Sequence, residues 1–101
     1  KEEARIDWNE SAHIIERKIR AFNPVPAAWV EYQGKPMKIW RAEVVAKQGN
    51  AGEVLSCTSD GLLVACGENA LNITELQPSG SKRMSIQAFA AGRTIEVGTV
   101  L

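Results

Sequence analysis

Two prolines close together divide the chain into a helical part and a β-rich part. Proline lacks a backbone N–H and disfavours helical geometry in the residue before it, so Pro24 must end a helix and Pro26 repeats the block. We therefore expect the connector Asn23–Ala27 to be extended. Beyond it, strand-like runs and turns continue until Ser85. The chain must change from helix to sheet at this connector.

The residues before the prolines have the spacing of an amphipathic helix. Apolar residues recur at intervals of three and four, which places them on one narrow helical face. Asp7 or Asn9 can cap the first turn. The expected helix runs from Trp8 to Phe22, and its buried face consists of Trp8, Ala12, Ile15, Ile19 and Phe22.

The remaining sequence predicts five or six strands and one further helix. The expected strands are Ala27–Tyr32, Met37–Ala46, Glu53–Cys57, Leu62–Cys66, Ala70–Leu76 and Thr94–Leu101. Turns containing Gly, Pro, Asn or Asp separate them. Ser85 can cap a short helix Ile86–Ala91, with Gly92 as its stop. Short strands in this number are typical of a mainly β domain, a closed or partly open antiparallel barrel.

Composition limits the partners of the chain. Its 101 residues carry 12 Lys and Arg and 12 Asp and Glu, so the formal net charge is zero. No overall field draws the chain to a polyanion, and a nucleic-acid site would have to be a local patch. No run of roughly 18 apolar residues is present, so the sequence predicts no membrane span.

Cys57 and Cys66 are expected to be reduced and buried. If the strands around them form a hairpin, Cys57 faces Leu62 and the two thiols lie roughly 13 Å apart. That separation is too long for a disulfide. Free cysteines favour a reducing compartment, which is the cytoplasm.

The sequence offers no catalytic or metal site. His13 is the only histidine, and it projects from the outer side of the expected helix. No second histidine or paired cysteine supplies the spacing of metal ligands. No serine stands in a nucleophile elbow, and no glycine-rich phosphate loop follows a strand. We therefore expect this chain alone to be catalytically inactive.

Basic residues supply candidates for a polyanion-binding patch. They are Lys82, Arg83, Arg93, Lys35, Lys38, Arg41, Arg17 and Arg20. Lys82 and Arg83 directly precede the expected second helix, whose free amides favour anions, and Arg93 follows it. Lys38 and Arg41 lie on the first hairpin, where strand alternation would place them on opposite faces. The alternative interpretation is that these residues are scattered solubilising charges.

The three tryptophans bear on how a nucleic acid would be bound. Trp8, Trp29 and Trp40 each lie in an apolar pattern, so we expect them in the core rather than on the surface. A buried ring offers no stacking surface for a base. Contacts with phosphates, which are independent of sequence, are therefore favoured over base readout.

Four segments, in this order, resemble one known family. They are Arg-Ile-Asp-Trp at Arg5–Trp8, the run Ile15–Trp29, the run Gly34–Val45 and the run Leu76–Ser85. Together they are similar to the C-terminal domain of bacterial methionyl-tRNA formyltransferases, from about Ala4 to the last residue. The most specific part is Arg-Ala-Phe-Asn-Pro-Val-Pro at residues 20–26.

The resemblance implies a fold and a function. The fold is an OB-like Greek-key barrel at residues 8–101, and residues 1–7 are a linker from an N-terminal catalytic domain that binds 10-formyltetrahydrofolate. The whole enzyme formylates the amino group of initiator methionyl-tRNA in translation initiation, and the basic residues named above hold the tRNA. This chain itself then needs no cofactor. The alternative is a structural barrel that braces the catalytic domain of another formyltetrahydrofolate-dependent formyltransferase and binds no nucleic acid.

Overall fold

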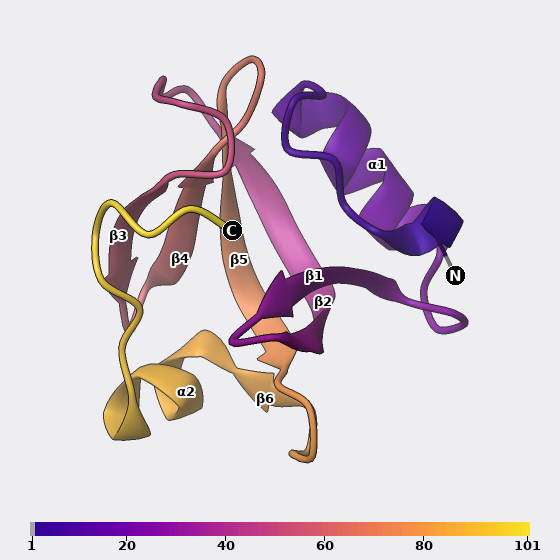
Figure 1. The fold of residues 1–101 in the computed structure, drawn as a ribbon, viewed down its shortest axis with the longest axis vertical. Coiled ribbons are helices and arrows are strands. Elements are labelled where there is room, and N and C mark those ends of the chain that lie inside the picture. Colours follow the sequence, from indigo (N-terminus) through magenta and orange to yellow (C-terminus); the bar gives the residue numbers. More distant parts are fainter. Residues whose placement is uncertain (1) are drawn as a thin grey trace.

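An antiparallel sheet of six strands forms the body of the structure (Figure 1). The structure is a computed structural model that describes residues 2–101. The strands are β1 (Ala28–Tyr32), β2 (Lys35–Val45), β3 (Val54–Thr58), β4 (Gly61–Ala65), β5 (Ala70–Gln77) and β6 (Met84–Ser85). They lie in the order β1-β2-β5-β4-β3, and β6 pairs with β5. β3, β4 and β5 form a meander, and its last strand, β5, pairs with β2. This is a Greek-key arrangement.

Among the described residues the sheet does not close into a barrel, because the two end strands, β1 and β3, do not pair. The prediction of a mainly β antiparallel fold is confirmed, in its partly open form. Segments from both ends of the chain cover the outer strands. Ile6 N donates to Trp29 O on β1 at 2.9 Å, and Val54 N on β3 donates to Thr99 O at 2.8 Å. Such cover keeps sheet edges from pairing with other chains.

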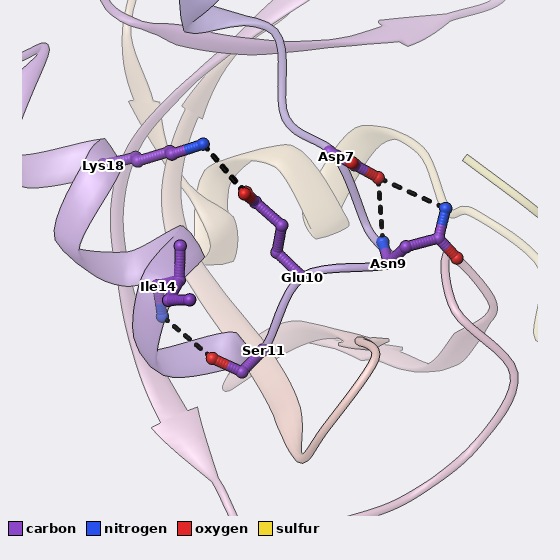
Figure 2. A network of polar contacts seen from close by, with 6 residues as sticks. All are labelled: Asp7, Asn9, Glu10, Ser11, Ile14 and Lys18. Atoms are coloured by element: carbon purple, nitrogen blue, oxygen red, sulfur yellow. Dashed lines mark hydrogen bonds and ion pairs between the residues drawn. The ribbon is translucent and has the colours of Figure 1, made fainter.

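The first helix, α1 (Ala12–Ala21), begins later than the sequence pattern predicts. Its N-cap is Ser11, whose Oγ accepts a hydrogen bond from Ile14 N at 3.2 Å. Figure 2 shows Asp7, one of the predicted caps, turned instead toward Asn9, whose backbone N donates to Asp7 Oδ1 at 3.0 Å. The prediction of a helix from Trp8 was therefore wrong by about one turn.

Contacts from a distant turn explain this late start. Gly67 N donates to Glu10 O, and Ala12 N donates to Glu68 O, both at 2.9 Å. These bonds hold residues 10 and 11, which are not helical, and the first residue of α1 against the turn before β5. Trp8 is still buried, so its predicted place in the core is confirmed although it lies outside the helix.

The connector after α1 is a turn rather than an extended segment. Ala27 N donates to Phe22 O at 2.9 Å and closes the loop that carries Pro24 and Pro26. The prolines stop the helix as predicted, but they do not straighten the chain. Phe22 is the C-cap of α1 and is half-buried, so it does not close the buried face as the spacing suggested.

One apolar core holds both helices against the sheet. Ile15 and Ile19 of α1, Ile73 and Leu76 of β5, and Phe89 of the second helix are each at most 2% exposed. Figure 1 shows α1 beside β2 and the second helix at the opposite end of the sheet, next to β6.

The second helix, α2 (Ile86–Gly92), starts where the sequence predicts. Ser85 Oγ accepts a hydrogen bond from Ala88 N at 3.1 Å, which confirms the predicted cap. Gly92 is the last helical residue rather than the stop, and Arg93 is the C-cap.

Residues 94–101 do not form the predicted last strand. Their one ladder contact is an isolated bridge between Glu53 and Val100. A turn at Val97–Gly98, where Gly98 has φ +93°, bends the segment, so it meets β3 only at separate points. Gly98 N donates to Val54 O at 2.8 Å at one of them.

Candidate nucleic-acid interface

Trp40 on β2 is half-buried and lies beneath two cations. Arg83 Cζ lies 4.5 Å from the centre of the Trp40 ring, and Lys38 Nζ lies 6.0 Å from it. Trp40 Nε1 donates to Gln77 Oε1 at 3.0 Å, which fixes the ring against β5. Cations over an indole face are attracted to it. The ring therefore collects positive charge at the surface.

The expectation that all three tryptophans lie in the core was wrong for Trp29 and Trp40. Both are half-buried, and Arg5 Cζ lies 5.1 Å from the centre of the Trp29 ring. The burial of β1 and β2 alternates along each strand, and both rings lie at half-buried positions, so an apolar strand pattern does not imply full burial there. The sequence contained a signal for this, since Lys38 stands two residues before Trp40 on the same strand face.

Glu75 on β5 joins two of the predicted cations. Its Oε1 accepts a hydrogen bond from Arg83 Nη2 at 3.0 Å and lies 3.9 Å from Arg41 Nε. The Arg83 guanidinium beside Glu75 holds the pKa of that carboxyl below its ordinary value, and the charge of Arg41 adds to the effect. Nothing in the sequence pattern marked Glu75, because its partners come from β2 and from the loop before β6.

An irregularity in β2 brings Arg41 into this group. The pairing of β2 with β5 shifts on both sides of Arg41, which then lies opposite Glu75. Such bulges re-aim a side chain relative to regular alternation. The expected separation of Lys38 from Arg41 therefore does not occur, since both belong to one chain of contacts that runs through Trp40, Arg83 and Glu75.

Three surface hollows are lined in part by these cations. The first, of about 350 Å³, is lined by Arg41, Thr74, Glu75, Arg83 and Ser85. The second, of about 200 Å³, is lined by Lys38 and by the loop from Gln77 to Gly80, among others. The third, of about 250 Å³, has Lys35 and Arg93 in its wall and shares Pro78 and Ser79 with the second.

We call this surface the basic strip and define it as Lys35, Lys38, Arg41, Arg83 and Arg93. The two sets of cations that the sequence placed on separate elements thus meet around the loop after β5. Lys82 is exposed beside Arg83 in that loop. At the start of α2, Ser85 Oγ accepts a hydrogen bond from one first-turn amide, Ala88 N. The side chains themselves supply the positive charge.

Arg17 and Arg20 lie on the exposed face of α1, as the helical pattern predicts. Arg20 Nε lies 2.8 Å from Glu16 Oε2, so its charge is partly neutralised. Neither residue lines the three hollows. They form a second candidate contact, separate from the basic strip.

Catalytic groups do not gather in the described part of the chain. Within residues 2–101, no three His, Cys, Asp or Glu side chains come together in a way that could hold a metal ion. His13 is exposed. Both cysteines are free, and burial raises the pKa of the Cys66 thiol to about 11, which disfavours the reactive thiolate. No described helix has the length and apolar character needed to cross a membrane.

These features define a class of protein, a small open antiparallel β domain with a basic surface. Among its described residues no catalytic groups gather. The chain belongs to the formyl transferase C-terminal domain family, whose profile matches residues 1–94. The resemblance seen in the sequence is thereby confirmed.

Curated relatives place this domain within longer enzymes. All 101 residues match 33% of a methionyl-tRNA formyltransferase of Neisseria meningitidis serogroup C (strain 053442), with 88% identity. A methionyl-tRNA formyltransferase of Dechloromonas aromatica (strain RCB) is 46% identical over 97% of this chain and 32% of that protein. The chain spans about a third of the length of these relatives.

Solved structures share the fold at lower identity. A variant of HypX from Aquifex aeolicus superposes with a TM-score of 0.71 and 24% identity, over 90% of this chain and 17% of that chain. HypX in complex with tetrahydrofolic acid gives a TM-score of 0.70 at 20% identity, over 99% of this chain and 21% of that chain. These likenesses show the fold alone.

Proposed function

We propose that this chain is the tRNA-binding domain of a methionyl-tRNA formyltransferase. The whole enzyme formylates the amino group of initiator methionyl-tRNA from 10-formyltetrahydrofolate in the cytoplasm. Folate binding and catalysis belong to a preceding catalytic domain, and residues 1–7 lead from it. This domain holds the tRNA body while the catalytic domain receives the acceptor end.

The basic strip is the observation that carries the proposal. Five cations from β2, the loop after β5 and the end of α2 line three hollows, although the chain as a whole has no net charge. Lys and Arg that neutralise phosphates supply most of the affinity for a nucleic-acid backbone. Trp40 is covered by Arg83 and Lys38, so phosphate contact is favoured over base stacking at this surface.

A second candidate function is structural bracing of a catalytic domain without RNA contact. The observation in its favour is pairing of cations with acids, as in Arg83 with Glu75 and Arg20 with Glu16. One fold can serve either function, and a tRNA-binding measurement distinguishes them.

The test is a titration of the chain with initiator and elongator tRNA at several salt concentrations. We expect weak binding with little preference between the two tRNAs, because phosphates carry the contact. Replacing Lys82 and Arg83 together with Ala should weaken both interactions alike and flatten the slope of log affinity against log salt by roughly 1–2 units. Absence of binding by the wild type at low salt would favour the bracing function.

A further inference from the structure

The hollow between Arg41 and Arg83 differs from the rest of the basic strip, because it already contains an acid. Glu75 Oε1 lies 3.0 Å from Arg83 Nη2 and 3.9 Å from Arg41 Nε. One carboxylate oxygen thus faces two guanidinium groups. Guanidinium groups bind carboxylate and phosphate oxygens with the same donor geometry. The carboxylate therefore occupies donors that would suit a phosphate.

The hollow has room for such a ligand. Its volume is about 350 Å³, and its wall includes the hydroxyl-bearing residues Thr74 and Ser85 besides the two arginines. A space of this size holds many water molecules and so admits a phosphate group. The Arg41 side chain is 76% exposed, so an incoming strand can reach it.

Arg83 is held in place before any ligand arrives. Its guanidinium lies over the Trp40 ring at 4.5 Å, and Trp40 is itself bonded to Gln77. An arginine whose position is fixed loses less conformational entropy when it binds an anion. Two guanidinium charges against one carboxylate also leave a net positive charge in the hollow.

Resting on the proposed RNA-binding function, we propose that this hollow binds one phosphate of an RNA backbone and that Glu75 is the internal competitor for it. In the free protein the Glu75 carboxylate satisfies Arg83 and partly neutralises Arg41. RNA must share or displace it. The competitor lowers the affinity of the strip for any polyanion, so only a ligand that also engages the other cations binds well.

Substitution of Glu75 by Gln tests the competition. Glu75→Gln keeps the side-chain shape and an acceptor for Arg83 but removes the negative charge. We expect it to raise affinity for tRNA about three- to tenfold at low salt and to steepen the salt dependence by up to about one unit. A general effect of net charge is controlled by Glu68→Gln. Glu68 is exposed and precedes β5. Since β5 rises roughly 17 Å between Ala70 and Glu75, Glu68 is distant from the hollow.

At an ionic strength of about 0.1 M, charges separated by more than roughly 10 Å are screened, so Glu68→Gln should change affinity less than about twofold. The gain from Glu75→Gln should also disappear in a protein that carries Arg41→Gln and Arg83→Gln, because no guanidinium remains to be freed. A gain of the same size from Glu68→Gln, or one that persists without the two arginines, overturns the proposal.

A second experiment distinguishes failure of this phosphate site from failure of the proposed tRNA-binding function. Inorganic phosphate is added to the labelled chain while NMR follows the Nε–Hε signals of Arg41 and Arg83. Both signals should shift at about three- to tenfold lower phosphate concentration in Glu75→Gln than in the wild type. If they shift but tRNA does not bind, the phosphate site stands and the tRNA-binding function fails. If tRNA binds but neither signal responds to phosphate in either protein, the site is overturned and the function stands.

Discussion

Arg83 lies with its guanidinium carbon 4.5 Å from the centre of the Trp40 ring, so a loop residue before α2 is packed onto the longest strand of the sheet. This contact ties the loop after β5 to β2. It also means that the position of the Arg83 charge depends on an aromatic ring that does not itself carry charge.

Removing the ring should therefore weaken RNA binding without removing a cation. Trp40→Leu should lower the affinity for tRNA about three- to tenfold and the free energy of unfolding by about 1–2 kcal/mol, since a half-buried ring and its cation contacts are lost. Trp40→Phe retains an aromatic face and should lose less affinity. Titration with tRNA and chemical denaturation measure the two effects. Equal affinities for the Leu and Phe variants would show that the ring does not position Arg83.

The second prediction compares two residues of α1 and its C-cap that differ in burial. Ile19 is 2% exposed, whereas Phe22 is half-buried at the helix end. Ile19→Ala should lower the free energy of unfolding by about 2–5 kcal/mol. Phe22→Ala should cost less, about 1–2 kcal/mol, because part of the ring already meets solvent. Chemical denaturation compares them, and a larger loss at Phe22 would contradict the packing described for α1.

A glycine before β5 should tolerate no side chain. A Cβ at Gly67 would collide with the backbone carbonyl oxygen of Asn9, and Gly67 N also donates to Glu10 O. Gly67→Ala should lower the free energy of unfolding by about 2 kcal/mol or more, because backbone must shift. Gly92→Ala is the matched control, since a Cβ there meets nothing within 4 Å. It should be neutral or slightly stabilising at the end of α2, and equal losses in the two variants would argue against this contact.

The same contact shows why the start of α1 was not predictable from the sequence. Spacing correctly placed Ala12, Ile15 and Ile19 on the buried face, because the helical period depends only on local geometry. The bonds to Gly67 and Glu68 that make the helix begin only at Ala12 come from a turn far along the chain. Local propensity carries no information about them.

The candidate site was likewise predictable only in part. Residue type identified every cation of the basic strip, and Ser85 was correctly predicted as a cap. Regular alternation placed Lys38 and Arg41 apart, because a bulge depends on pairing with β5 and leaves no mark on composition. The part played by Glu75 depends on β5, β2 and the loop before β6 at once, so no single segment could indicate it.

Glu75 should make stability depend on pH. Its pKa is lowered from the ordinary value of 4.5 by Arg83 and Arg41, so the carboxylate is stabilised in the folded state. The resulting stability is present above pH 4.5 and is lost as pH falls through the lower folded pKa. The difference in unfolding free energy between wild type and Glu75→Gln should therefore be larger at pH 6 than at pH 3. Denaturation curves across this range measure it, and a constant difference would mean that the ion pair does not form in solution.

The location of the RNA contact is tested most directly by two variants that each lose two cations. One replaces Lys35 and Arg93 with Ala in the third hollow of the basic strip, and the other replaces Arg17 and Arg20 with Ala on α1. Both change net charge equally, and circular dichroism checks that both fold. Affinity for tRNA is then measured from about 50 to 200 mM salt. Binding by the strip predicts that the first variant loses about tenfold or more and flattens the salt slope by roughly 1–2 units, while the second changes less than about threefold. A larger loss from the α1 variant would contradict the assignment of the strip as the RNA-binding surface.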